Sequence, residues 1–210
     1  MKVVILATNE QKKEIEIKNV SHSASLIFIA STEEIEQLED FDAIFLLAGE
    51  PSDTSLKEYS DKPVLIHSVI DTLGDRKSPS NYSRINAWPG FLKRPTWEVA
   101  ANDEDAAGLV FKELGWNVVF VKDEPGLVAA RVISMIINEA YFALEEKVST
   151  IKEIDLAMKL GTNYSAGPFE WKGIIGIRNI YCLLQRLSET DNRYLPAPLL
   201  REEYRKIYPQ

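Results

Sequence analysis

Short apolar runs alternate with polar stretches along the first 122 residues of the chain. Each run is long enough for one strand, and together they predict the strands Lys2–Ala7, Ser25–Ala30, Asp42–Leu47, Pro63–Ser68, Arg84–Trp88 and Val118–Lys122. Continuous runs such as residues 43–47 are typical of strands buried on both faces, as in a parallel sheet covered by helices. Two helices are predicted between the strands, one from the capping box Ser31–Glu34 to about Glu39 and one from its cap Asn102 through Leu114. This alternation indicates an open α/β architecture.

The pattern changes at Asp123–Gly126, and the apolar stretches after it have helical spacing. Leu127–Glu146 is apolar almost all round, which predicts a central buried helix. A second capping box and later apolar stretches predict helices at Thr150–Gly161, Gly173–Ser188 and Ala197–Ile207. We therefore expect an α/β domain at residues 1–122 and an all-helical domain at residues 123–210. Because 88 residues provide little cover for so apolar a helix, we expect the helical domains of two copies to pair as a homodimer.

Composition narrows the classes of function. The chain has 210 residues, of which 45% are hydrophobic and 27% charged, and its formal net charge is −8. This charge argues against a nucleic-acid partner and against an electrostatic membrane anchor. A single cysteine, Cys182, excludes an intramolecular disulfide, and the separation of His22 from His67 argues against a zinc site. No apolar run is long enough to span a membrane, so we expect a cytoplasmic protein with no membrane partner.

The turn after the first predicted strand is where a dinucleotide-binding fold places its phosphate loop. That loop needs glycines, because the backbone must approach the pyrophosphate closely. The turn here, Thr8–Lys13, contains no glycine, and its Glu10 adds a charge of the same sign as phosphate. The second predicted strand ends at Ala30-Ser31-Thr32, so the acidic residue that binds ribose is absent unless Glu33 replaces it. We therefore expect no cofactor.

Four motifs in the second half of the chain resemble the 3-hydroxyacyl-CoA dehydrogenase family. They are Lys122–Arg131 continued by Asn138-Glu139-Ala140, Glu153–Thr162, Gly167–Glu170 and Arg193–Leu200, in the family's order and nearly its spacing. The resemblance covers residues 84–200 well and residues 1–83 loosely. It implies a shortened Rossmann-like α/β domain with a parallel sheet, followed by an all-helical dimerisation domain. The activity it implies is the NAD-dependent oxidation of the 3-hydroxyl of an acyl-CoA.

The family's reaction depends on a histidine–glutamate pair, in which the glutamate orients the imidazole that acts as general base. In this chain the histidine position falls on Ile85, whereas Glu98 stands at the glutamate position. The family's asparagine after the Pro-Gly turn falls on Ala130. Its polar stretch retains Ser68 and, beside it, a displaced histidine, His67. The resemblance therefore implies Glu98 as the catalytic candidate and Ser68 and His67 as substrate-binding candidates, with no cofactor-binding or metal-binding residue.

Three hypotheses about function remain open. The chain is a 3-hydroxyacyl-CoA dehydrogenase-like protein impaired in NAD binding and catalysis, which acts as an acyl-CoA-type ligand-binding subunit or as a partner subunit. Alternatively, it is an active NAD-dependent oxidoreductase with a rearranged site, in which Glu98 acts with Ser68 or His67. In the third hypothesis it is a dimeric scaffold without ligand. For His67 a plainer interpretation also stands, that of a partly buried residue at a strand end.

Overall fold

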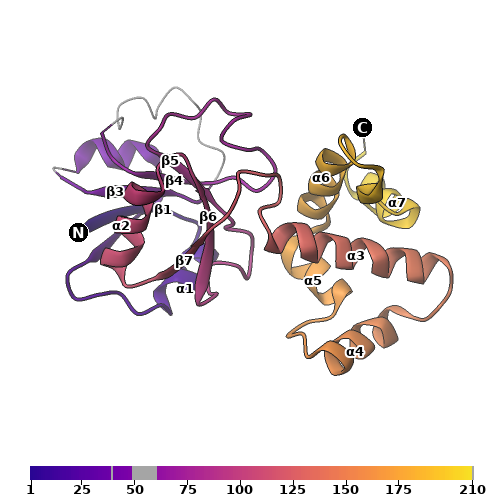
Figure 1. The fold of residues 1–210 in the computed structure, drawn as a ribbon. Helices are drawn as coiled ribbons and strands as arrows, with labels where there is room; N and C mark the ends of the chain where they lie inside the picture. Colours follow the sequence, from indigo (N-terminus) through magenta and orange to yellow (C-terminus); the bar gives the residue numbers. More distant parts are fainter. Residues whose placement is uncertain (39, 49–60, 210) are drawn as a thin grey trace. The chain divides into compact units, whose positions relative to one another are not determined.

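The chain folds as two compact units in the computed structural model, which describes residues 1–38, 40–48 and 61–209. The first comprises Met1–Leu127 and is called the sheet unit here; the second comprises Val128–Gln210 and is called the helical unit. Figure 1 shows the strands in indigo to magenta and the helical unit in orange to yellow. Among the described residues, no helix is both long enough and apolar enough to span a membrane.

The sheet unit is built on one seven-stranded sheet in the order β2-β1-β3-β4-β5-β6-β7. Its strands are β1 (Lys2–Leu6), β2 (Ser25–Ile29), β3 (Ala43–Leu46), β4 (Val64–His67), β5 (Tyr82–Ile85), β6 (Thr96–Ala101) and β7 (Asn117–Phe120). β1 to β5 are parallel, β6 is antiparallel to β5, and β7 is parallel to β6. The α/β class with a Rossmann-like, mainly parallel sheet is thus confirmed, and the antiparallel pairing of β6 with β5 is a feature that the sequence did not predict. Residues 86–95 join β5 to β6 without a helix, and a parallel pair would need a longer crossover.

Alternate residues of the strands pack on the two faces of this sheet, as the two-residue period of a strand requires. On one face, Val3, Ile5 and Phe45 pack with residues of α1 (Asn9–Glu16) and α2 (Glu104–Leu114). On the other face, Val4 and Ile44 pack with Ile35 of the short 3₁₀ helix η1 (Thr32–Gln37). The predicted cover on both faces is therefore present, although α-helices provide it on one face only among the described residues.

Several predicted boundaries differ from the structure. The expected loop Thr8–Lys13 is mostly helix, because Thr8 and Gln11 form a capping box that starts α1 at Asn9. The helix predicted from Ser31 is the 3₁₀ helix η1, and its predicted end at Glu39 lies outside the described residues. Asp103 caps α2 in place of Asn102. Strand β6 was not predicted from the sequence.

The helical unit packs around α3 (Ala129–Glu145), which contacts α5, α6 and α7. The other helices are α4 (Ile151–Thr162), α5 (Pro168–Ile175), α6 (Ile177–Ser188), the 3₁₀ helix η3 (Asn192–Tyr194) and α7 (Pro198–Ile207). The prediction of one helix at Gly173–Ser188 is wrong, because Gly176 has φ +89° and separates α5 from α6. A left-handed φ of this kind interrupts a right-handed helix and favours glycine.

The four motifs of the second half contact one another inside this unit. Asn138 of α3 donates from Nδ2 to the carbonyl of Leu195 at 3.0 Å, and its Oδ1 accepts from the amide of Ala197 at 2.8 Å. The buried Asp155 of α4 accepts from the amide of Phe169 at 2.8 Å. Each contact satisfies a backbone group that burial would otherwise leave unpaired. These motif residues therefore hold the helices together.

Candidate functional site

The strand order places a topological switch point between β1 and β3. The chain leaves β1 toward β2 on one side and returns from β2 to β3 on the other side of β1. In open α/β sheets, ligands bind at the carboxyl ends of the strands at such a point. The residues there are Ala7 and Thr8 after β1, residues 47–48 after β3, and the first turn of α1. A ligand-binding site of the sheet unit is therefore expected at this edge.

The side chain of Gln11 crosses the carboxyl edge of the sheet. Its Oε1 accepts from the amide of Thr8 at 2.9 Å, while Thr8 Oγ1 accepts from the amide of Gln11 at 3.2 Å. Its Nε2 donates to the carbonyl of Leu47 at 2.9 Å and to that of Ala87 at 3.3 Å. One side-chain amide therefore joins the start of α1 to the end of β3 and to the segment that follows β5.

Two further side chains of the α1 segment hold the loop after β5. The carboxylate of Glu14 accepts from three backbone amides, those of Gly90 at 2.6 Å, Leu92 at 3.1 Å and Lys93 at 3.3 Å. Lys18, just beyond α1, donates to the carbonyl of Arg94 at 2.6 Å. Gln11 and Glu14 are three residues apart and therefore lie on one face of α1, and Lys18 follows the end of the helix. We call these three residues the α1 latch.

One part of the latch resembles the binding of an anion, because the three amides donate to the negatively charged Glu14. Backbone amides that converge on one point form an anion-binding nest, and here a carboxylate of the protein itself lies in that nest. Sequence reasoning missed both Gln11 and Glu14. The signal that was available for Gln11 is the spacing Thr8-x-x-Gln11, which is a capping box at the start of a helix.

His67 lies at the end of β4 and is partly buried. Its Nδ1 accepts a hydrogen bond from the amide of Ala87 at 3.1 Å. The pKa of His67 is lowered to about 4, mainly by burial; a backbone hydrogen bond to Ile85 opposes this shift and the charge of Arg76 adds to it. The imidazole is therefore neutral at pH 7, and the nitrogen that a general base would use already has a partner.

Ser68 is buried in the turn after β4. Its hydroxyl donates to the carbonyl of Asp71 at 2.7 Å and accepts from Nε of Arg76 at 3.3 Å. Its carbonyl accepts from the fully buried Arg84, whose Nε also binds Asp123 at 2.5 Å. The position of Ser68 is thus explained by the hydrogen bonds of a turn, which hold β4, β5 and the segment before the helical unit together.

Glu98 is half-buried in the middle of β6 and lines a small hollow in the sheet unit. The other residues that line this hollow are Asn86, Phe91, Arg94, Thr96 and Trp97. Arg94 stands close enough to Glu98 for the carboxylate to raise the pKa of the guanidinium, although burial lowers that pKa overall. Ile85, at the family's histidine position, is buried in the core that faces α1 and α2. Neither His67 nor Ser68 lines the hollow, so the structure does not bring the three candidates together there.

Asn86 directly follows Ile85, which stands at the position of the missing histidine. Its Oδ1 accepts from the amide of Trp88 at 3.0 Å, and its buried Nδ2 has no hydrogen-bond partner among the described residues. An amide neither gives nor takes a proton at neutral pH, so Asn86 does not replace an imidazole as a base. The described residues also contain no group of three or more His, Cys, Asp or Glu that could hold a metal ion.

The comparisons with known proteins agree with the motifs of the helical unit. Residues 126–206 match the family model of the 3-hydroxyacyl-CoA dehydrogenase C-terminal domain. The 3-hydroxyadipyl-CoA dehydrogenase of Escherichia coli (strain K12) is 40% identical over 93 residues, which are 43% of this chain and 20% of that protein. A 3-hydroxybutyryl-CoA dehydrogenase of Bradyrhizobium diazoefficiens is 38% identical over 90 residues, or 42% of this chain and 31% of that protein. The match thus spans less than a third of either relative.

The whole chain is similar in fold to a solved structure. It matches the crystal structure of (S)-3-hydroxybutyryl-CoA dehydrogenase from Ralstonia eutropha with a TM-score of 0.72, over 99% of this chain and 94% of that chain. The sequence identity is 19%, so this likeness establishes the fold alone. The resemblance stated from the four motifs is confirmed for the helical unit, and the Rossmann-like fold is confirmed for the sheet unit.

Proposed function

Because residues 126–206 belong to the 3-hydroxyacyl-CoA dehydrogenase family through its C-terminal domain, we propose that this chain is a dehydrogenase-like protein impaired in NAD binding and in catalysis. We propose that it acts as a binding subunit for an acyl-CoA-type ligand or as a partner subunit. The observation that carries the proposal is the α1 latch. The side chain of Gln11 binds the carbonyl of Leu47 after β3, and that of Glu14 binds backbone amides of the loop after β5, so these groups are engaged in contacts within the protein.

The residues at this edge do not fit the diphosphate of a dinucleotide. A pyrophosphate needs free backbone amides at a helix start and a backbone without bulky side chains. In this chain the helix starts with a capping box of Thr8 and Gln11, and Glu10 and Glu14 place two carboxylates in α1. Like charges near a phosphate raise the cost of binding it. The absence of a histidine around Glu98 among the described residues supports the loss of proton transfer.

The proposal is tested with the full chain and two ligands. We expect no saturable enhancement of NADH fluorescence up to about 1 mM NADH. A dissociation constant of about 1 mM corresponds to a binding free energy of only about 4 kcal/mol. We also expect no oxidation of NADH when acetoacetyl-CoA is added. The crystallised Ralstonia eutropha relative, measured in parallel, is the positive control. Saturable NADH binding together with turnover would overturn the proposal in favour of an active enzyme that uses Glu98 with Ser68 or His67.

Acetoacetyl-CoA separates the two remaining roles. Calorimetric binding of acetoacetyl-CoA without NADH supports a ligand-binding subunit. Failure to bind, in a chain that stays dimeric on dilution, supports the alternative of a dimeric scaffold without ligand. Both outcomes are read on the same protein sample, and neither depends on the NADH result.

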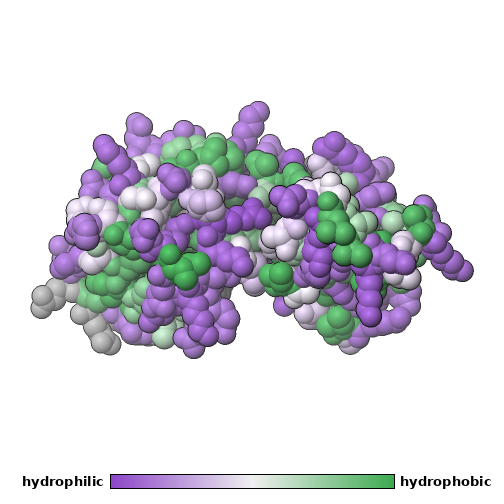
Figure 2. Space-filling model, turned by 90° about the horizontal axis from the view of Figure 1, so that it is seen from below, coloured by the Kyte–Doolittle hydropathy of each residue, from purple (hydrophilic) through white to green (hydrophobic). Residues whose placement is uncertain are grey.

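The proposed homodimer is supported by one face of α3. Val132, Met135 and Ile136 form the apolar wall of a hollow of about 400 Å³, and Val132 is 51% exposed. Exposed hydrophobic residues lie on the surface of the helical unit (Figure 2). Arg131 and Glu139 line the same hollow, each four residues from Met135 and thus about 6 Å along the helix axis.

This arrangement is self-complementary. In a two-fold symmetric contact, two copies of α3 cross antiparallel with Met135 near the axis, so that each Arg131 meets the Glu139 of the other copy. The apolar residues between them would then be covered on both copies. We propose this face of α3 as the homodimer interface, in agreement with the prediction that a second copy covers this apolar helix.

A further inference from the structure

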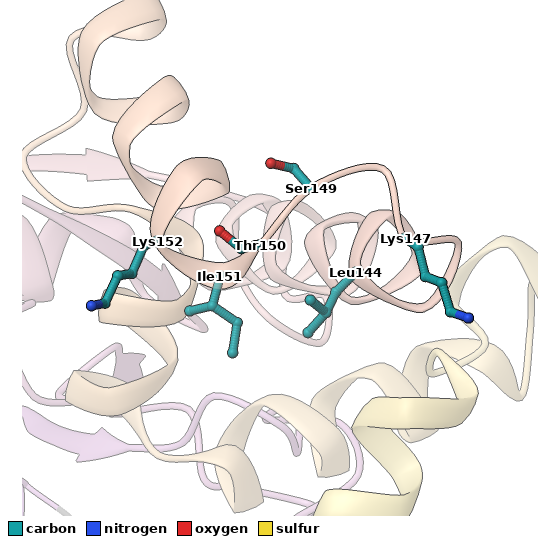
Figure 3. Close-up of a pocket in the computed structure, with 6 residues that line it drawn as sticks. All are labelled: Leu144, Lys147, Ser149, Thr150, Ile151 and Lys152. Carbon is teal, nitrogen blue, oxygen red and sulfur yellow. The ribbon is translucent and has the colours of Figure 1, made fainter.

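A second open groove lies in the helical unit where α3 passes into α4. It is lined by Leu144, Lys147, Ser149, Thr150, Ile151 and Lys152 and has a volume of about 730 Å³. In Figure 3 the side chains of Leu144 and Ile151 point into the same open space, while the two lysines lie at opposite ends of the row. The groove thus has an apolar floor and a cation at each end.

The hydroxyl groups of the groove are already used. Ser149 Oγ and Thr150 Oγ1 donate to the same oxygen of Glu153, at 2.8 Å and 2.9 Å, as part of the cap of α4. In Figure 3 both hydroxyls point away from the open space. The ammonium groups of the two lysines are therefore the polar groups that this row of residues presents to a ligand.

Both lysines stand at positions where the local backbone favours another residue type. Lys147 follows α3 with φ +58°, a conformation that favours glycine or asparagine. Lys152 lies in the first turn of α4, where the helix dipole favours carboxylates over cations. The dipole of α3 favours a cation just after its C-terminal end, so the charge of Lys147 agrees with that helix, whereas the charge of Lys152 opposes the dipole of α4.

We propose that this groove binds an anionic amphiphile, that is, an alkyl chain of about eight or more carbons with one carboxylate or similar anionic head. Leu144 and Ile151 would cover the chain, and Lys147 or Lys152 would pair with the head. Charge complementarity carries this choice of occupant, because an apolar floor between two ammonium groups matches an apolar chain with an anionic end. The site lies wholly in the helical unit and does not depend on the function proposed for the sheet unit.

Octanoate is the probe, titrated into the full chain with labelled leucine and isoleucine methyl groups. We expect saturable NMR shifts at the methyls of Leu144 and Ile151. Octanol lacks the charge and butanoate lacks the chain, so we expect both to bind more weakly than octanoate. Octanol binding as tightly as octanoate, or octanoate shifts confined to other methyls, would overturn the proposal.

Lys147→Gln and Lys152→Gln test the role of the cations. An exposed ion pair corresponds to a two- to fivefold change in affinity, so we expect about that loss from each variant and a larger loss from the double variant. Lys112→Gln, which removes an exposed lysine of α2, is the control and should leave the affinity unchanged. An unchanged affinity in the double variant contradicts the proposal. The proposal is also contradicted if the NMR signals of the Leu144 and Ile151 methyls shift when the protein is diluted but do not shift when octanoate is added. The occupant of the groove would then be a second copy of the chain.

Discussion

Individual side chains in the sheet unit are held by bonds that explain their position without catalysis. Ser68 closes a turn with Asp71, and Arg84, with no exposed surface, binds Asp123 and two backbone carbonyls. For His67, a structural role predicts a measurable pH dependence of the free energy of unfolding. Its acceptor nitrogen is used by a backbone amide, and burial keeps the ring neutral.

His67 should make the stability of the sheet unit depend on pH. Its pKa is about 4 in the folded chain, against 6.5 when exposed. Between these values the unfolded chain binds a proton that the folded chain does not, so stability rises with pH in this window. The free energy of unfolding therefore falls by about 3 kcal/mol as the pH is lowered from above 6.5 toward 4, because the unfolded chain gains a proton on His67.

His67→Asn provides the comparison, because its Oδ1 can accept from Ala87 as Nδ1 does but does not titrate. We expect the unfolding free energy of the unmodified chain, minus that of the variant, to fall by about 3 kcal/mol from pH 7 to pH 4. Chemical denaturation at several pH values measures this difference. His22→Asn controls for the removal of an exposed imidazole. A difference that stays constant with pH would show that burial does not hold His67 neutral.

At the scale of elements, α1 determines what the carboxyl edge of the sheet can do. Three hydrogen bonds from backbone amides converge on Glu14, and bonds to a charged group are each worth about 1.5–3 kcal/mol. Glu14→Ala should therefore release the loop after β5. We expect the amides of Gly90, Leu92 and Lys93 to exchange with solvent deuterium about ten to a hundred times faster.

Glu16→Ala is the matched control, since Glu16 is exposed on the same helix and forms an ion pair with Lys12 at 3.7 Å, away from the loop after β5. It should leave exchange in the loop unchanged. Equal exchange in the Glu14 variant and the unmodified chain would mean that the loop is held without α1. The latch would then give no support to the proposed loss of the nucleotide site.

The elements also show how far the sequence could predict the fold. Five of the seven strands lie within one or two residues of their apolar runs, because buried parallel strands need continuous apolar residues. Strand β6 was missed because Glu98 interrupts its apolar residues, and Arg84–Trp88 was placed too late because Asn86 turns the chain after Ile85. The latch was missed for another reason. Its bond to Leu47 joins residues 36 positions apart and its bonds to the segment after β5 join residues 76 to 79 positions apart, and no local pattern indicates such contacts.

At the scale of the whole molecule, an acidic sheet unit is joined to a helical unit that carries the family motifs. Residues 1–122 hold 20 acidic and 13 basic residues, which is most of the formal charge of −8. The helical unit is close to neutral, so electrostatic repulsion between two copies of it is small. This favours assembly through the helical unit, in agreement with the homodimer interface that we propose on α3.

The pairing of Arg131 with Glu139 across a two-fold axis can be tested by exchanging their charges. Arg131→Glu or Glu139→Arg alone would place like charges opposite each other twice per dimer, and we expect the dissociation constant to rise about tenfold. The double variant restores opposite charges at both places, so its dissociation constant should return close to that of the unmodified chain. Sedimentation equilibrium over a range of concentrations measures all three variants.

Glu146→Arg, an exposed change beyond the end of α3 and outside the hollow, separates a local pairing from a general effect of charge. If it weakens the dimer as much as Glu139→Arg does, net charge and not pairing is responsible. If the double variant dissociates as readily as either single variant, the two residues do not meet and the interface lies elsewhere. If the dissociation constant returns to that of the unmodified chain in the double variant and in neither single variant, the contact is antiparallel. Only that arrangement brings residue 131 of one copy to residue 139 of the other.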